Sequence, residues 1–398
     1  MSKNINIPKL RFKEFSGDWE DKTINDVANI IGGGTPDTTV KEYWNGNIQW
    51  FTPTEIKSMY ISNSKRTISE LGLKKSSAKI LPKGSLLLST RATVGDVGIA
   101  VNECTTNQGF QSLIITKNNN NIFIYNWILN NKIEFLKKSS GSTFLEISKK
   151  EIEKIKIITP SKQEQEKIAS FLTSVDTKIE QLTKKETLLK EYKKGVMQKI
   201  FNQEIRFVSD DGSEFGDWEK RKIGEIFKFK QGVQCGVENQ FLQQSNGQIR
   251  FIRIVDVTSD EEPIRYIENP GSEHQIMEDD LFMVRYGAAG VVGYGYSGVL
   301  ANNLFRFLPI NSLKIKNKFY FFLFNYMKHK FEQLAGSSTM PALNFKSLNT
   351  LTIIQPSLKE QTKIANFLSS IDTKIEQTRK QLEQTKEFKK ALLQKMFV

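Results

Sequence analysis

The sequence predicts an α+β protein built from two copies of one unit, each copy ending in a long helix. The segment that starts at Pro160 returns at Pro356, 196 residues later, with 24 of 42 positions identical. Short β-type runs separated by turn residues precede each copy, and an apolar period of seven residues runs through each repeated segment. The predicted segments are a first block, a first helix, a second block and a second helix: 1–159, 160–202, 203–355 and 356–398.

The first block shows strand and turn signals in alternation. Short, largely apolar runs between turn signals predict strands at Ile48–Phe51 and Ser85–Ser89. Glycine, proline and asparagine predict turns at Gly32–Pro36 and Asn45–Asn47. A helix is expected over Phe123–Lys138, so the block combines strands with a helix and is classed as α+β.

The second block follows the same plan. Strands are expected at Ile249–Val257 and Leu281–Tyr286, a glycine-rich turn region at Gly287–Gly298, and a helix at Phe319–Leu334. The frames of the blocks agree as well, because Arg11-Phe12 returns as Arg206-Phe207. Two similar frames around different blocks suggest one apparatus that recognises two different things.

The repeated segments predict a coiled coil. Pro-Ser opens each one, as suits the first turn of a helix, and apolar residues then recur at 4/3 spacing for about five heptads. These residues are Ile168, Leu172, Val175, Ile179, Leu182, Leu189, Val196 and Ile200 in the first helix, and Ile364, Leu368, Ile371, Ile375, Leu382, Leu392 and Met396 in the second. Polar residues interrupt this seam at Glu186, Lys193, Thr378, Thr385 and Lys389.

A pseudo-two-fold relation between the copies would place the two helices antiparallel, with the two blocks at opposite ends of a rod. A helix of about 40 residues is ~60 Å long, which is long enough to hold two binding modules about one DNA turn apart, ~34–36 Å. The alternative is that each helix packs only on its own domain.

Charge favours a polyanionic partner. Lys and Arg total 57 against 44 Asp and Glu, a net charge of +13. Nucleic acid is the first candidate and an anionic membrane surface the second. No apolar run approaches the ~18 residues of a membrane span, no apolar signal segment opens the chain, and the two cysteines, Cys104 and Cys235, suit a reducing cytoplasm.

Several motifs together resemble the specificity subunit of type I restriction–modification enzymes. The matching strings are Pro160-Ser161 with Glu164-Gln165 and Lys167-Ile168-Ala169, Pro356-Ser357 with Glu360-Gln361 and Lys363-Ile364-Ala365, Gly33–Pro36 with Glu42–Trp50, and Arg91–Gly95 with Thr106–Phe110. The second block lacks the Gly-Thr-Pro and Tyr-Trp-Asn-Gly strings, and its counterpart is sought at Arg285–Gly290 with Asn302-Asn303.

The resemblance implies a function. Each block would be a target recognition domain for one half of a split sequence in double-stranded DNA, and the two helices would set the gap between the half-sites. The helices would also dock two modification subunits, which bring the S-adenosylmethionine chemistry, and the assembly would recruit two motor–nuclease restriction subunits.

The chain itself carries no motif for catalysis and is expected to need no cofactor or metal. It has no Asn/Asp-Pro-Pro-aromatic string for adenine methylation and no P-loop, and His274 and His329 lack metal-ligand spacing to either cysteine. Two other classes stay open: an enzyme with its own recognition module, and a coiled-coil scaffold or DNA-binding module outside restriction. Binding that falls steeply with salt would favour DNA recognition over a scaffold.

Candidate DNA contacts are side chains that can donate to base edges or phosphates from loop-like strings. They are Thr35, Asn45, Arg91, Thr93, Asn107, Gln108 and Thr143 in the first block, and Arg253, Arg285, Tyr286, Asn302, Asn303 and Thr339 in the second. An ordinary surface or structural hydrogen-bonding role is the alternative for each. Trp44 and Trp50 are expected to be core aromatics rather than stacking platforms.

Candidate partner contacts come from the Ile-Ala-x-Phe-Leu string of each helix. They are Ile168, Phe171, Leu172, Ile364, Phe367 and Leu368. Because the helices carry more aromatic residues than a solvated pair needs, they are expected to present docking surfaces. The alternative is that these aromatics pack on the chain's own recognition domains.

Overall fold

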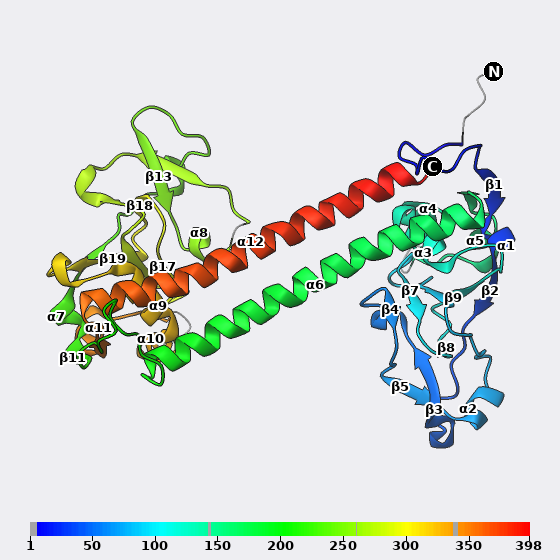
Figure 1. Ribbon diagram of the computed structural model, residues 1–398, viewed down its shortest axis with the longest axis horizontal. Helices are drawn as coiled ribbons and strands as arrows, with labels where there is room; N and C mark the ends of the chain where they lie inside the picture. Colours follow the sequence, from blue (N-terminus) through cyan, green and yellow to red (C-terminus); the bar gives the residue numbers. More distant parts are fainter. Residues whose placement is uncertain (1–5, 142–144, 260, 337–340) are drawn as a thin grey trace. The chain divides into compact units, whose positions relative to one another are not determined.

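The computed structural model describes residues 6–141, 145–259, 261–336 and 341–398. They form two compact units, each containing one of the repeated blocks: unit 1 comprises Met1–Thr183 and Lys380–Val398, and unit 2 comprises Lys184–Arg379. Many of their elements are labelled in Figure 1. The helices α6 (Lys162–Phe201) and α12 (Leu358–Met396) each contribute to both units.

Unit 1 is an α+β domain. Its strands are β1 (Glu20–Thr23), β2 (Ala28–Gly32), β3 (Trp44–Phe51), β4 (Tyr60–Ile61), β5 (Arg66–Ile68), β6 (Leu86–Leu88), β7 (Val97–Ala100), β8 (Thr105–Thr106), β9 (Gln111–Ile115) and β10 (Lys156–Thr159). Its shorter helices are α1 (Ile24–Val27), η1 (Lys41–Tyr43), η2 (Pro53–Glu55), α2 (Glu70–Lys74), α3 (Asn121–Asn130), α4 (Lys132–Lys137) and α5 (Lys149–Glu153).

Unit 2 has the same class of fold. Its strands are β11 (Glu219–Lys222), β12 (Phe227–Gln231), β13 (Gln248–Ile252), β14 (Arg265–Glu268), β15 (Gln275–Ile276), β16 (Leu281–Val284), β17 (Val292–Gly293), β18 (Gly298–Leu300), β19 (Leu304–Pro309) and β20 (Thr352–Gln355). Its shorter helices are α7 (Ile223–Ile226), η3 (Val237–Asn239), α8 (Val255–Thr258), η4 (Ser272–His274), η5 (Ser312–Lys314), α9 (Asn317–Tyr326), α10 (Lys328–Ala335) and α11 (Phe345–Thr350).

The two units share a sheet topology. The order β2-β9-β6-β7-β4 in unit 1 corresponds to β12-β19-β16-β17 in unit 2, and β5-β3-β8 corresponds to β14-β13-β18-β15. In each unit the first block strand pairs antiparallel with the strand just before the long helix, β1 with β10 and β11 with β20. The duplicated α+β fold predicted from the sequence is therefore confirmed.

Several local predictions need correction. The helix expected over Phe123–Lys138 is two helices that meet at Asn131, and that over Phe319–Leu334 is two helices that meet at Met327. The strand expected at Ile249–Val257 ends at Ile252, because the backbone N–H of Arg253 then bonds the Asp256 carboxylate and a helical turn follows.

The turn expected at Asn45–Asn47 is a bulge inside β3. Trp44 and Ile48 both pair with Ile68, and Asn45 adopts a φ of 60°. A Cβ at Gly46 would lie 2.5 Å from the Cα of Ser69, so only glycine allows this approach. Trp44 and Trp50 are buried, with ring centroids 5.0 Å apart, which confirms them as core aromatics.

The long helices pack on the domain cores and on each other within each unit. In unit 1, the α6 residues Ile168 and Leu172 share a core with Leu392 and Met396 of α12. In unit 2, Ile200 of α6 shares a core with residues 364–371 of α12. Low-numbered residues of one helix therefore lie beside high-numbered residues of the other, an antiparallel arrangement. Both alternatives drawn from the sequence therefore occur: the helices pack on each other, and each also packs on the core of its own domain.

Two interruptions of the predicted seam form ion pairs between the helices. The Lys193 ammonium lies 2.5 Å from the Asp372 carboxylate in unit 2, and the Lys389 ammonium lies 2.6 Å from the Asp176 carboxylate in unit 1. The two pairs are related by the 196-residue offset of the repeat. These ion pairs can form in only one antiparallel alignment of the two helices, so they specify the register, as polar seam residues in coiled coils often do.

Candidate nucleic-acid interface

Three loops of unit 1 meet through backbone hydrogen bonds. The segment after β2 joins the β8–β9 loop, because the N–H of Gly34 donates to the carbonyl of Thr106 (2.8 Å). A Cβ at Gly33 would lie 1.9 Å from the Asn107 carbonyl, so glycine is required for this close approach. The β6–β7 loop joins the same group through Thr90, whose N–H donates to the carbonyl of Gly109 (2.8 Å).

The loops bring five of the predicted DNA contacts of unit 1 into one region: Thr35, Arg91, Thr93, Asn107 and Gln108. The Thr35 hydroxyl donates to the side-chain carbonyl of Gln108. The Asn107 side-chain oxygen accepts from the N–H of Gly109 (2.9 Å), so part of its hydrogen-bonding capacity serves the loop itself. We call this group of three loops the unit 1 loop cluster: residues 33–35, 90–95 and 107–109.

Arg91 lies on the exposed side of the unit 1 loop cluster. Its guanidinium pairs with the Glu146 carboxylate at 2.8 Å, and both side chains stay nearly half exposed, at 47% and 44%. Such a pair contributes little to stability, so Arg91 can exchange it for a phosphate or a base edge. Asn45 lies apart from this cluster, in the β3 bulge, where it is exposed.

The two tryptophans of the core hold the first of these loops in place. The indole N–H of Trp50 donates to the carbonyl of Gly34 (2.9 Å), and that of Trp44 donates to the carbonyl of Asp37 (3.0 Å). The Arg66 guanidinium carbon lies 3.5 Å from the centroid of the Trp44 ring. The Trp44–Trp50 pair therefore acts as a scaffold beneath the loop and is not itself a surface for stacking bases.

Unit 2 builds the same loop arrangement with different side chains. Two pairs of backbone hydrogen bonds define the correspondence. In unit 1, Thr90 N–H donates to Gly109 O (2.8 Å) and Ile147 N–H donates to Thr90 O (3.2 Å). In unit 2, Arg285 N–H donates to Asn303 O (2.8 Å) and Leu343 N–H donates to Arg285 O (3.0 Å). Arg285 therefore occupies the place of Thr90, and Tyr286 that of Arg91. The string comparison, which set Arg285 beside Arg91, is off by one residue. We call residues 285–290 and 302–303 the unit 2 loop cluster.

Left-handed backbone positions support this alignment. Ala92 and Gly95 have φ of 61° and 85°, and Gly287 and Gly290 have φ of 80° and 89°. The hydrogen bond from Gly95 N to Ser89 O (3.0 Å) returns as that from Gly290 N to Val284 O (3.0 Å). Identical backbone turns thus present different side chains in the two units.

Arg253 does not lie in the unit 2 loop cluster. Its guanidinium pairs with Asp256 at 3.0 Å and donates to the carbonyl of Pro263 (2.8 Å), with the side chain 17% exposed. These contacts make it a local brace of the turn after β13. Thr143 and Thr339 lie outside the described residues.

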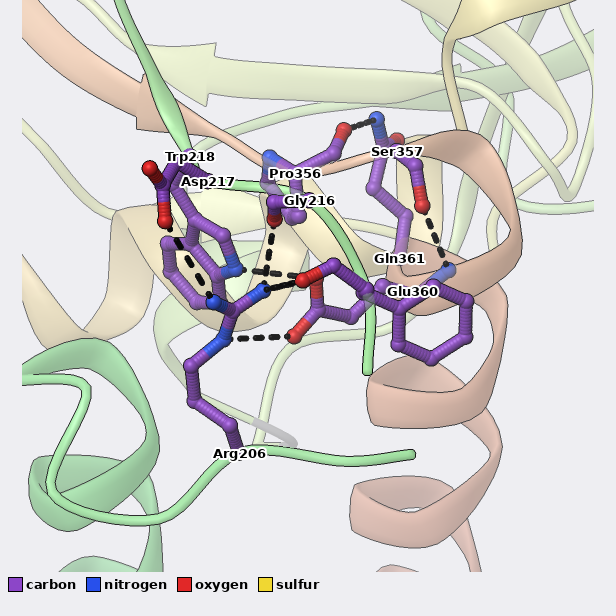
Figure 2. Close-up of polar contacts among 9 residues, drawn as sticks. Arg206, Gly216, Asp217, Trp218, Pro356, Ser357, Glu360 and Gln361 are labelled. Atoms are coloured by element: carbon purple, nitrogen blue, oxygen red, sulfur yellow. Dashed lines mark hydrogen bonds and ion pairs between the residues drawn. The ribbon is translucent and has the colours of Figure 1, made fainter. Parts of the chain in front are cut away.

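A buried Glu-Gln pair opens each long helix and has a structural role that the sequence motifs do not reveal. Figure 2 shows the pair in unit 2. Glu360, which is 0% exposed, accepts from the Arg206 guanidinium (3.0 and 3.3 Å) and from the indole N–H of Trp218 (2.9 Å). Arg206 also donates to the carbonyl of Gly216 (2.7 Å), which ties the segment before β11 to the start of α12.

Unit 1 repeats the arginine–glutamate part of this joint, but the indole N–H of Trp19, which matches that of Trp218, has no hydrogen-bond partner among the described residues. Arg11 bonds both oxygens of Glu164 at 2.8 Å, and this hydrogen bond raises the pKa of Arg11. The neighbouring Gln165 donates to the carbonyl of Pro160 (3.0 Å) and accepts from the N–H of Asn120 (2.9 Å). Gln361 makes the matching bonds with Pro356 and Lys316. The signal available in the sequence was the repeat of the arginine 195 residues later and of the Glu-Gln pair 196 residues later.

The helix string predicted to contact partners is largely buried inside the chain. Ile168, Leu172, Ile364 and Leu368 are at most 2% exposed and belong to the two cores. Phe171 and Phe367 are half-buried, with T-shaped contacts to Phe12 (5.7 Å) and Phe207 (5.5 Å). The four aliphatic residues offer no surface to a partner, since the chain's own domains cover them.

Exposed aromatic residues occur elsewhere on the helices. Tyr192 of α6 and Phe388 of α12 occupy equivalent repeat positions and are 53% and 52% exposed. In unit 1, Phe388 borders a surface hollow of about 310 Å³, which Leu182 of α6 also lines. These two residues replace the buried string as candidates for partner contact.

Neither cysteine has the environment of a nucleophile. Burial raises the pKa of the Cys104 thiol to about 12, and burial and Glu238 raise that of Cys235. Among the described residues, no three His, Cys, Asp or Glu side chains gather as a metal site would require. Nor does any helix in the described parts of the chain have the length and apolar character to cross a membrane.

The two cysteines are expected to differ in reactivity. At pH 8 a disulfide reagent such as Ellman's should modify Cys235 slowly and leave Cys104 untouched, because the thiolate is the reactive form and Cys104 is buried. Native protein should release one equivalent of chromophore and denatured protein two. The variant Cys235→Ser should remove the native reaction, and native labelling of Cys104 would contradict the buried position.

The chain is thus a duplicated, basic protein with two related but different loop clusters. A family model described as the type I restriction modification DNA specificity domain matches residues 16–191 and again 216–386. The chain therefore belongs to this family, which confirms the resemblance drawn from its motifs.

Individual relatives agree over the whole length. The type I restriction enzyme MjaIX specificity subunit of Methanocaldococcus jannaschii is 29% identical over 95% of this chain and 92% of its own. The putative MjaX specificity subunit of the same organism is 27% identical over 98% and 95%. The crystal structure of a type I restriction–modification S subunit from M. genitalium has the same fold, with a TM-score of 0.63 at 17% identity, covering 98% of this chain and 99% of that one.

Proposed function

We propose that this chain is the sequence-recognition subunit of a type I restriction–modification complex, in which each unit recognises one half of a split target in double-stranded DNA. The observation that carries the proposal is the duplicated loop cluster. The same backbone hydrogen bonds present Arg91 and Gln108 in unit 1 and Tyr286 and Asn302 in unit 2. A shared frame with different hydrogen-bonding groups suits two readers of different base sequences.

The net charge of +13 supports DNA as the partner. Phosphate contacts by Lys and Arg supply affinity without sequence preference, and loop side chains then supply the preference. The catalytic steps would come from partner subunits, two for modification and two for restriction, and the chain would be non-catalytic by itself. The recognition domains would be residues 1–159 and 203–355, joined by spacer helices over 160–202 and 356–398.

Exchange of one block tests the two-reader model. Replacing residues 203–355 with the equivalent block of a relative is expected to change one half of the methylated sequence and leave the other half unchanged, since each half-site depends on one loop cluster. The measurement is genome-wide mapping of methylated bases in cells that carry the parental or the exchanged chain. The reciprocal exchange of residues 22–159 is the control and should change only the opposite half.

A change in both halves after a single exchange would contradict the model. If the exchanged chain does not fold and all methylation is lost, the new block is incompatible with the rest of the chain. The test is then repeated by exchanging residues 219–355, which keeps the Arg206–Gly216 joint. The β11–β20 pairing stays intact in that exchange because both strands move together.

The docking of modification subunits is proposed at the exposed aromatics of the helices. Tyr192 lies one turn beyond Leu188, which is also 53% exposed, and Phe388 borders the hollow beside Leu182. Large apolar side chains that a chain leaves exposed at equivalent positions are typical anchors for a partner. The duplication gives one such position per helix, which agrees with two modification subunits per chain.

A further inference from the structure

We propose that Arg285 is a positioning residue that holds the unit 2 loop cluster in shape and does not itself contact a base. The inference rests on the proposed function and deepens it, since it assigns which side chains of unit 2 are left to recognise DNA. This role differs from the expectation drawn from the sequence, because an arginine in a recognition loop is usually the candidate for contact with guanine.

The guanidinium of Arg285 is engaged on several sides. Nη1 donates to the side-chain oxygen of Gln231 (2.5 Å), and Nε donates to the carbonyl of Leu343 (3.2 Å). The guanidinium carbon lies 4.3 Å from the centroid of the Phe345 ring and 4.8 Å from that of Tyr286. Contact with a base edge would require the side chain to give up this fork of hydrogen bonds and its stacking on Phe345.

Gln231 extends the contact to a second loop. It ends strand β12, and its amide nitrogen donates to the carbonyl of Asn302 (2.6 Å) in the β18–β19 loop. The relay from Arg285 through Gln231 to Asn302 therefore joins the β16–β17 loop, the end of β12 and the β18–β19 loop. Both polar atoms of the Gln231 amide take part in these bonds, so its role is internal as well.

Unit 1 fixes its loops by other means. Thr90 stands at the place of Arg285, and its hydroxyl donates to the carbonyl of Gly109 (3.1 Å). Gly32, at the end of β2, stands at the place of Gln231 and has no side chain with which to form such a relay. The Thr35–Gln108 hydrogen bond joins the corresponding loops there. In unit 2 the long side chains of Arg285 and Gln231 thus connect the loops that the short Thr90 side chain helps to connect in unit 1.

Asn302 and Tyr286 of the unit 2 loop cluster are left as the candidates for base recognition, since the side-chain oxygen of Asn303 is buried. Asn302 is exposed, and only its backbone carbonyl takes part in the relay. Tyr286 is half-buried, with its ring beside the Arg285 guanidinium. An amide and a phenol hydroxyl can each donate to and accept from base edges.

The test uses the full chain, with any subunits that co-purify with it, and a library of random DNA duplexes from which bound sequences are selected and sequenced. Arg285→Ala and Gln231→Ala are each expected to weaken binding to the second half-site ~10-fold, with the order of preferred bases unchanged. The double variant should be no weaker than either single one, because both residues act through one relay. Asn302→Asp is the comparison, and it should relax or change the preference at one base pair.

Arg285→Lys keeps the charge but not the fork, so it should reproduce the weakening if the alanine variant does not fold. A change of preference at one base pair in the Arg285 variants, with Gln231→Ala unaffected, would make Arg285 a base reader and overturn the proposal. Unchanged binding in both variants would also overturn it. Failure of the parental chain to select any split sequence would instead refute the proposed function.

Discussion

Replacing Glu360 with alanine is expected to lower the free energy of unfolding of unit 2 by about 3–5 kcal/mol. The carboxylate is fully buried and serves two donors, the Arg206 guanidinium at 3.0 Å and the Trp218 indole at 2.9 Å. Its removal leaves a largely buried cation and a buried N–H without their partner, which costs more than the loss of a surface ion pair. Urea unfolding followed by tryptophan fluorescence measures the change, since Trp218 lies in the joint.

Asp217→Ala provides the matched control. Asp217 is the other carboxylate near Arg206, but it lies 4.0 Å away and its side chain is fully exposed. Its loss is expected to leave the unfolding midpoint unchanged, because exposed pairs contribute little. Glu360→Gln keeps the shape of the side chain and one acceptor oxygen. Its unfolding midpoint should therefore lie between those of the Glu360→Ala and Asp217→Ala variants. Equal midpoints for the Glu360→Ala and Asp217→Ala variants would contradict the structural role of the joint.

Introducing aspartate at both exposed aromatics, Tyr192→Asp with Phe388→Asp, is expected to release the modification subunits from the chain. Loss of an aromatic anchor, with a charge left in its place, should raise the dissociation constant at each site ~30-fold or more. The fold should be retained, because both side chains are about half exposed at the helix surface. Gel filtration of the co-expressed complex, with thermal unfolding of the chain alone, measures both effects.

The control is Gln198→Asp with Gln394→Asp. These glutamines are also exposed and related by the repeat offset, so the pair adds the same charge to the same helices away from the aromatics. This control variant should keep both modification subunits bound. A Tyr192/Phe388 variant that elutes with two modification subunits would remove these residues from the interface. The earlier candidates Phe171 and Phe367 are poorer test sites, since aspartate there would also disturb the contacts with Phe12 and Phe207.

The loop clusters illustrate what a local sequence signal can predict. Donors in loop-like strings predict Arg91, Thr93, Asn107 and Gln108 as DNA contacts, and the structure brings these residues together with Thr35 in one region. The same pattern predicts a DNA contact at Arg253, but this side chain braces a turn, because the Asp256 carboxylate on the same turn pairs with its guanidinium. Residue type and loop position do not reveal such local competition.

Partner contacts were harder to predict for a related reason. An Ile-Ala-x-Phe-Leu string on a long helix fits a docking face and a domain core equally well, since both require an apolar stripe. The choice depends on what covers the stripe. In unit 1 that cover is the block itself together with the end of α12, which lies more than 200 residues further along the chain.

By itself the sequence determined the duplication, the α+β class, the two long helices and the basic character of this protein. These follow from identity at a fixed offset, hydrophobic period and charge, which are local or additive properties. Only the tertiary structure decided that the Glu-Gln pairs are buried joints, that Lys193 and Lys389 meet Asp372 and Asp176, and that Arg285 takes the place of Thr90. Each depends on contacts between residues far apart in the chain, and the free energy of burying and pairing polar groups is set by those contacts and not by residue type.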